Sequence, residues 1–479
     1  MGPPKQQQQH AQPAKKQKLS VEYPAPAVAS LFTAAAGLAT QPSPGAMHGC
    51  RVAAADLPRA AAERGGFASV FASGPGVFLH SVLLPSPPAP CVGREGLMMP
   101  ALTPAPPAAR LRLPRHAGEV QAVALRALRA GGGGGEGGAG GGEGDDVTGL
   151  VLATADAYGI GTLARVALGP GDWEAQAEEE QREGDAEAAA AAAVAAVVES
   201  TERIEPEDPL REGGWAGAAF SHARPSLLAV ARGCARDLTL YDGARRLRTM
   251  RAATQPYALA FLPAGAHSGG GDALALAEGN AVSVWDVRAG ERGGCVQRLL
   301  VAPTGSPLYA LAWSGAQGGL LGAAGSERAV QLIDPRRWRC LDKWAGATRQ
   351  AIHHLSFLTA APEYACASGL DSEVVCGCWV APPPPVAVKP YTVAPGEAEE
   401  AGAAAGRAGA EDGDGGDGGG GGGAFSYRGD SRWLGVAKAA GTDVLAGFSA
   451  SGRVTYARIT AGVAVQPAGG SGRNSAGPA

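Results

Sequence analysis

One pattern occurs three times in the 479 residues of this chain, as Asp237-Leu-Thr-Leu-Tyr-Asp242, Asn280-Ala-Val-Ser-Val-Trp-Asp286 and Arg328-Ala-Val-Gln-Leu-Ile-Asp334. Each copy begins with a polar turn, continues as an alternating apolar stretch, and ends with a bulky residue followed by Asp. Short alternating stretches bounded by turn residues are typical of β-strands. The final aspartates lie 44 and 48 residues apart. The pattern therefore predicts one strand that recurs at a nearly fixed spacing.

Two more strands precede each copy. The nearer one consists mostly of small residues (LLAVARG, ALALAEG and LLGAAGS), and the farther one is also apolar (AGAAFSH, YALAFLP and LYALAWS). With a fourth strand after each Asp, every repeat holds four strands. This period and strand count are those of a β-propeller blade. No helical period is sustained outside the low-complexity segments, so we expect an all-β fold.

Extending the same frame in both directions gives seven units. The positions equivalent to the final Asp fall near Ser81, Ala164, Cys378 and Arg458. Small residues beside the axis would let seven sheets approach closely, and a closed ring removes free sheet edges. The last blade needs a strand from the other end of the chain. We expect Val28–Phe32 or Val463–Val465 to supply it.

The repeat resembles the WD40 family, whose Trp-Asp dipeptide occurs literally at Val284-Trp285-Asp286. The resemblance implies a seven-bladed WD40-type β-propeller. The family usually also has a His before each blade, bound to an Asp in a turn. Here only His116 occupies the place of that His, and Asp156 and Asp371 are candidate turn acids. Most units lack the pair.

Low-complexity segments interrupt the repeats. The predicted organisation is a disordered basic tail over 1–18, a propeller over 19–464 and a disordered tail over 465–479. The propeller carries insertions at 85–110, 131–146, 171–210 and 382–423. Gly-rich tracts are entropically unfavourable to order, and Pro-rich runs favour extended, solvated chain. Within 171–210, the Glu and Ala content predicts a short helix over Ala186–Arg203.

Overall charge and composition exclude several classes of function. The net charge of −4 argues against nucleic-acid binding by bulk charge, and no apolar run is long enough to span a membrane. Eight scattered cysteines do not form a disulfide framework. Lys15-Lys16-Gln17-Lys18 fits a nuclear import signal, an organellar transit peptide or an inert tail. We expect a nuclear or cytoplasmic protein.

No pattern of an enzyme site is present. Phosphate-cradling loops, His-Glu-x-x-His and Gly-x-Ser-x-Gly are all missing from the sequence. Cys376-Gly-Cys378 and the His353-His354 pair have no ligand spacing, so we interpret the thiols as buried free cysteines and expect no metal or cofactor. Arg428-Gly429-Asp430 is interpreted as a turn. The acidic runs around Glu178–Glu180 and Glu411–Asp417 are either solvated loops or sites for basic tails.

Two turns carry a more specific motif. Trp285-Asp286-Val287-Arg288 matches Trp-Asp-x-Arg, and Ile333-Asp334-Pro335-Arg336 repeats Asp-x-Arg one unit later. Such consecutive motifs resemble those of WD40 substrate receptors of cullin-4 ubiquitin ligases, which implies that the arginines engage the ligase adaptor. Alternatively, each Arg pairs only with its own blade's Asp or with a loop. We therefore predict a non-catalytic protein-interaction scaffold, with the ligase receptor as the alternative. The candidate partner-binding residues are Trp285, Asp286, Arg288, Asp334, Arg336, Arg337, Trp338 and Arg428.

Overall fold

The computed structural model describes the strands and their connecting loops. The described residues are 25–34, 38, 51–56, 66–83, 91–92, 97–103, 108–129, 147–168, 196–209, 213–263, 273–289, 294–315, 319–380, 423–439 and 441–461. They form seven sheets and contain no helix. Consequently, no helix in the described residues could cross a membrane.

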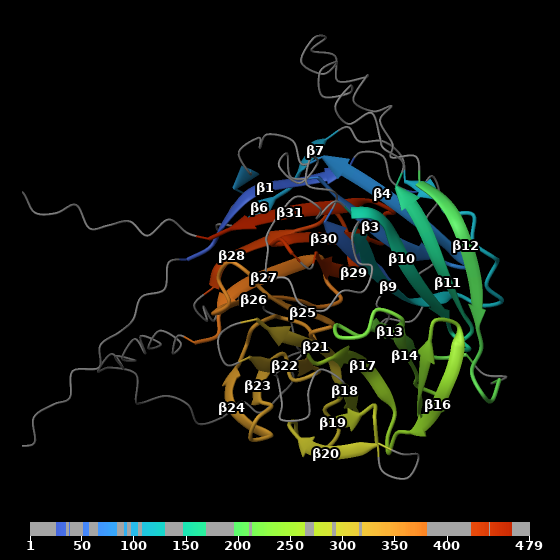
Figure 1. The fold of residues 1–479 in the computed structure, drawn as a ribbon. Coiled ribbons are helices and arrows are strands. Elements are labelled where there is room, and N and C mark those ends of the chain that lie inside the picture. The colour runs from blue at the N-terminus through green and yellow to red at the C-terminus, as the bar shows by residue number, and fades with distance from the viewer. Residues whose placement is uncertain are drawn as a thin grey trace, which may run out of the picture.

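The seven sheets are the blades of a propeller arranged around a common axis (Figure 1). We number the blades from 1 to 7 by the order of their innermost strands. Blade 1 holds β2 (Val52–Asp56), β3 (Gly66–Ser73), β4 (Gly76–Leu83) and β8 (Ala109–Arg110); blade 2 holds β9 (Val120–Arg129), β10 (Val147–Asp156), β11 (Gly161–Leu168) and β12 (Ala196–Ile204); blade 3 holds β13 (Ala216–Phe220), β14 (Leu227–Arg232), β15 (Asp237–Asp242) and β16 (Arg245–Arg251); blade 4 holds β17 (Pro256–Phe261), β18 (Ala273–Glu278), β19 (Ala281–Asp286) and β20 (Cys295–Leu300).

The remaining three blades follow the same plan, and two of them gain extra strands. Blade 5 holds β21 (Leu308–Ser314), β22 (Leu320–Gly325), β23 (Val330–Asp334) and β24 (Arg339–Trp344); blade 6 holds β25 (His354–Phe357), β26 (Tyr364–Ser368), β27 (Glu373–Cys378) and β28 (Gly423–Arg428), with β6 (Met98–Met99) and β5 (Cys91–Val92) outside them; blade 7 holds β29 (Trp433–Lys438), β30 (Val444–Ser449), β31 (Val454–Thr460) and β1 (Ala27–Ala34), with β7 (Ala101–Thr103) outside them. The predicted seven-bladed, all-β fold is confirmed.

The second strand of each blade lies in the core because it is covered on both faces by neighbouring blades. All six residues of β14, β18 and β30 are buried, and Ala, Gly and Ser recur among them. A Cβ atom added to Gly322 in β22 would lie 2.9 Å from Leu355 and Phe357 of the next blade. Alanine and glycine are therefore needed where the sheets approach one another. The outer strands β16, β20 and β24 are mostly exposed and carry the charged residues.

The ring is closed by the N-terminal strand. β1 pairs antiparallel with β31 and becomes the fourth strand of blade 7, so the prediction for Val28–Phe32 is confirmed. The alternative, Val463–Val465, lies outside the described residues. The innermost strands contact one another in sequence from β2 to β29, and β29 contacts β2. Tyr456 of β31 also fastens blade 7 to blade 1, since its hydroxyl lies 2.9 Å from Ser69 Oγ and hydrogen-bonds to His80 Nδ1.

The structure corrects two predictions about the insertions. The described part of the helix expected over Ala186–Arg203 is the strand β12, which pairs with β11 along Ala196–Ile204. The segment 85–110, expected to stay unpacked, supplies β6 to blade 6, β7 to blade 7 and β8 to blade 1. The tail 1–18, the tract 131–146, the tail 465–479 and all of 382–423 except Gly423 lie outside the described residues.

The connections between strands gather at two rims of the ring. Rim 1 holds the connections from the first to the second strand and from the third to the fourth strand of each blade, and rim 2 holds the others. In blade 3, for example, both turns of rim 1 are joined by a hydrogen bond from Gly243 N to Ser226 O of 2.8 Å.

Candidate functional site

Trp285, Asp286 and Arg288 hold one another in place in blade 4. Trp285 is 6% exposed, and its Nε1 donates to Ser283 Oγ at 2.9 Å, so it belongs to the core. Asp286 accepts hydrogen bonds from the backbone N and the Nε of Arg288 at 2.9 and 3.1 Å, and from its Nη2 at 3.1 Å. The Arg288 side chain remains 52% exposed. In the structure, then, this arginine pairs with its own blade's Asp.

The equivalent turn of blade 5 is arranged differently. Asp334 Oδ1 accepts a hydrogen bond from Arg336 N at 2.9 Å, while Arg336 and Arg337 are exposed. Among the described residues, no carboxylate forms an ion pair with either guanidinium. Trp338 adopts a φ of 48° and packs partly buried against the core between blades 4 and 5. This turn therefore presents two arginines at rim 1 and fixes them through Asp334 and Trp338.

Arg428 lies apart from these turns. It stands at the rim 2 end of β28, where its Nη2 is 3.4 Å from Glu373 Oε2 in the same blade. The following Gly429 donates from its N to Ser372 O at 2.9 Å, and Asp430 accepts hydrogen bonds from Ser449 and Ser451. Arg428 ends the strand β28 and Asp430 lies in the bend that follows it, so the expected turn begins only after Arg428; Arg428 is not part of the rim 1 group.

Rim 2 brings His116 and Asp156 close together in blade 2, although no hydrogen bond joins their side chains. His116 Nε2 is 2.9 Å from Thr154 Oγ1, and its Nδ1 is 3.7 Å from Asp156 Oδ2. Asp156 Oδ1 accepts the backbone N–H groups of Tyr158 and Ile160, each at 3.0 Å, and so fixes the turn. Asp371 lies in the corresponding turn of blade 6, between β26 and β27, and burial raises the pKa of its carboxyl.

In other blades, different charged residues link the strands to the neighbouring loop, and the repeat pattern did not indicate them. In blade 4, Glu278 accepts a hydrogen bond from Ser283 Oγ and another from Ala253 N at 2.9 Å, so one carboxylate joins the strands to the preceding loop. In blade 3, Arg232 and Asp237 form a buried ion pair instead. A charged residue at the last position of the small-residue strand was the available signal, as in LLAVAR and ALALAE.

The thiols and the histidine pair show no sign of metal binding in the described residues. Cys366 and Cys376 are buried free cysteines on facing strands, and no group of three or more His, Cys, Asp or Glu in the described part of the chain is placed to hold a metal ion. His353 stacks on Tyr309 with ring centroids 4.6 Å apart. Burial lowers the pKa of His354 to about 4.

A groove with polar residues in its wall lies at rim 1 between blades 2 and 3. It exists because the strands of blade 2 are longer than those of blade 3: β9 and β10 have 10 residues each, whereas β13 has 5 and β14 has 6. The face of blade 2 therefore extends beyond its neighbour. The groove has a volume of about 220 Å³ between this overhang and the turn 221–226.

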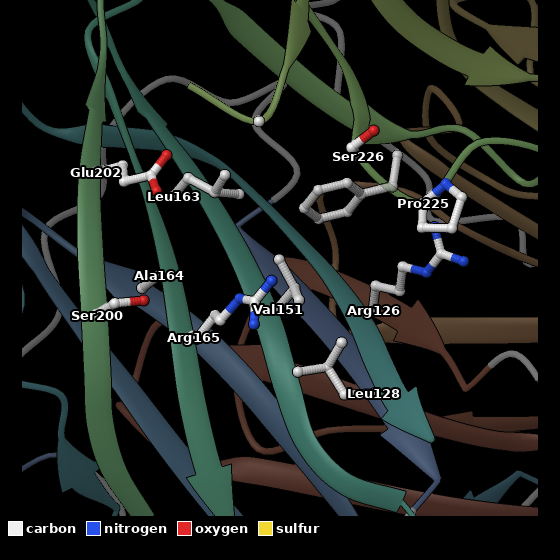
Figure 2. A pocket seen from close by; sticks show the side chains of 12 residues that line it. Arg126, Leu128, Val151, Leu163, Ala164, Arg165, Ser200, Glu202, Pro225 and Ser226 are labelled. Atoms are coloured by element: carbon white, nitrogen blue, oxygen red, sulfur yellow. The ribbon is translucent and has the colours of Figure 1, made fainter. Parts of the chain in front are cut away.

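Two arginines form the wall on blade 2. The strand registers place Arg126, Val151, Arg165 and Ser200 in one row across the sheet. Figure 2 shows Arg126 and Arg165 on either side of Val151. Each arginine interrupts a row of small or apolar residues along its own strand, for example Ala122, Ala124 and Leu128 beside Arg126. That interruption was the signal by which the sequence could have identified them.

The opposite wall is apolar and rigid. Phe220, Pro225, Ser226 and Gly243 of blade 3 line it. Ser221 Oγ accepts from the backbone N of Ala223 at 3.2 Å and of Arg224 at 3.1 Å, which fixes the turn. Arg126 Nη1 contacts Ser221 O at 3.5 Å, and burial lowers the pKa of Arg126. His222 also has a lowered pKa, caused first by burial and then by the charge of Arg126.

Two solved structures share the architecture of this chain. One is Raptor from Chaetomium thermophilum, with a TM-score of 0.53 and 9% identity over 91% of this chain. The other is a chain of the mitotic checkpoint complex, with a TM-score of 0.50 and 10% identity over 92% of this chain and 98% of its own length. The fold is a seven-bladed β-propeller, and these two solved structures share it.

At these identities the likeness is one of fold alone. The match covers 29% of the Raptor chain. No family model and no curated protein matches the sequence.

Proposed function

We propose that the chain is a non-catalytic scaffold that binds other proteins through rim 1. The observation that carries this proposal is that rim 1 brings together the arginine groove of blades 2 and 3 and the exposed arginine turns of blades 4 and 5. Arginine guanidinium groups are preferred anchors at protein interfaces. A rigid ring holds these anchors in fixed relative positions, which is what a scaffold requires.

Affinity purification of the full chain followed by mass spectrometry tests the proposal. We expect partners that are lost when rim 1 arginines are replaced and retained in Arg112→Ala/Arg115→Ala, a control pair of exposed arginines in the loop between blades 1 and 2 at rim 2. Partners that withstand every rim 1 substitution would contradict the proposal.

A cullin-4 substrate receptor is the second candidate. Its support is that the two Asp-x-Arg turns occupy equivalent positions in adjacent blades, with Arg336 exposed. The ion pair of Arg288 with Asp286 would have to open or be shared on binding. Co-purification of the ligase adaptor that is lost in Arg288→Ala/Arg336→Ala supports this role, and adaptor binding that is unchanged in the double variant opposes it.

Two further proposals concern segments outside the described residues. The acidic runs near Glu178 and Glu411 are proposed to hold basic tails of partners, which high salt should release. A nuclear or cytoplasmic location is proposed from Lys15-Lys16-Gln17-Lys18. Imaging of a fluorescent fusion with these lysines replaced by Ala tests the nuclear part.

A further inference from the structure

The charge distribution in the groove between blades 2 and 3 favours an anionic ligand. Arg126 and Arg165 stand in one row, and Glu202 is the only carboxylate among the described residues lining the groove. Glu202 faces Leu163 in the neighbouring row, so it stands nearer to rim 2 than the arginines do. In the described part of the chain, no ion pair engages Arg165. The row of the two arginines is therefore locally cationic.

The spacing of the arginines restricts the shape of the ligand. Arg126 and Arg165 are two strands apart in one row, so their Cα atoms are about 10 Å apart, twice the distance between adjacent strands. Because arginine side chains are long and flexible, the two guanidinium groups can approach each other more closely than the Cα atoms do. In an extended peptide, side chains two residues apart point to the same side about 7 Å from each other. Two carboxylates at that spacing match the two guanidinium groups.

The apolar wall adds a second requirement. Leu128 and Val151 on one side and Phe220 and Pro225 on the other leave room for an apolar side chain beside the charged row. Burial around Arg126 strengthens its attraction for an anion, because a partly desolvated charge is screened less by water and salt. Guanidinium also binds carboxylate through two parallel hydrogen bonds.

We propose that this groove binds an extended acidic segment of a partner protein. Two carboxylates two residues apart lie on Arg126 and Arg165, and an adjacent apolar side chain packs against Phe220. This inference rests on the proposed scaffold function and specifies one class of partner for it.

Fluorescence anisotropy with the full chain and labelled peptides tests the inference. The probes are short peptides that carry Asp or Glu at positions i and i+2 beside a Leu or Phe. The control peptides have Lys in place of the acids, or the two acids far apart. We expect binding only by the first set, and weaker binding at high ionic strength.

Substitutions locate the binding. Arg126→Ala and Arg165→Ala should each weaken binding about tenfold, as expected for the loss of one charge-assisted pair. Arg165→Lys should weaken binding less than Arg165→Ala does, because lysine keeps the positive charge but cannot form the two parallel hydrogen bonds of a guanidinium. The rim 2 control Arg112→Ala/Arg115→Ala should bind like the wild type. Unchanged urea midpoints of unfolding will show that each variant is folded.

Three results would overturn the inference. The first is equal binding of the basic peptides, and the second is binding that survives both arginine substitutions. The third is that peptides bind only after Glu178, Glu179 and Glu180 are changed to Gln, which would make the chain's own acidic run the occupant. If affinity purification still yields partners that depend on the turns of blades 4 and 5, the scaffold function stands while the groove inference fails.

Discussion

The ion pair between Arg232 and Asp237 offers the sharpest test of how the blades are joined. Their side chains are 3% and 1% exposed, and Arg232 Nε donates to Asp237 Oδ1 at 2.9 Å. Arg232 Nη1 also reaches across to blade 2 and its loop, with distances of 2.7 Å to Asp208 O and 3.4 Å to Tyr158 O. The carboxylate of Asp237 thus compensates a charge that links two blades.

We predict that Asp237→Ala lowers the free energy of unfolding by about 3–5 kcal/mol, because it leaves a buried guanidinium without its counter-charge. The double variant Arg232→Met/Asp237→Ala removes both charges and should recover most of that loss, since a buried pair can be replaced by apolar groups with little change. Urea unfolding followed by tryptophan fluorescence measures both, and an unchanged slope would show that the unfolded reference is the same.

Two outcomes would refute this reasoning. One is a single variant within about 0.5 kcal/mol of the wild type, which is the range of ordinary surface substitutions. The other is a double variant that is as unstable as the single one. In that case the loss would come from the missing side chains and not from the uncompensated charge.

Three further predictions follow from other contacts. His116→Ala should lower the free energy of unfolding by about 1–3 kcal/mol because it removes a buried side chain and its hydrogen bond with Thr154 Oγ1, and an unchanged urea midpoint would oppose this. The lowered pKa of His354 means that the folded state binds fewer protons than the unfolded chain, so this group should lower the free energy of unfolding as the pH falls from about 6.5 to about 4. Urea titrations at several pH values should show a smaller loss of this free energy for His354→Gln than for the wild type. An equal loss in both proteins would oppose the prediction. A chain that begins at Ala35 should lose at least about 3–6 kcal/mol relative to one that begins at Ala25, because Leu31 and Phe32 are fully buried; equal thermal midpoints would oppose it.

The repeating part of the fold was predictable from the sequence because its signal is local. The third strands β15, β19 and β23 carry the quoted pattern themselves, and β11, β27 and β31 lie where the frame placed them. The closing strand was narrowed to two short apolar stretches, and pairing with β31 selects Val28–Phe32.

The errors arose where pairing with a distant strand decides the structure. β12 lies in a segment rich in Glu and Ala, whose helix propensity suggested a helix, yet Val197, Val198 and Thr201 pair with β11. β6 and β7 are too short to recognise alone and form only on the edges of blades 6 and 7. The groove depends on the different strand lengths of blades 2 and 3, which no single repeat reveals.

Strands from both ends of the chain close the ring in blade 7, and a cross-link measures this closure. Thr33 and Thr455 face each other in β1 and β31, with their Oγ1 atoms 2.8 Å apart. Facing residues of antiparallel strands are close enough for a disulfide. Mass spectrometry of oxidised Thr33→Cys/Thr455→Cys should find an intramolecular peptide that joins positions 33 and 455, and the out-of-register control Thr33→Cys/Thr460→Cys should not yield its equivalent. Absence of the first link, or a link only between two molecules, would contradict the closed ring.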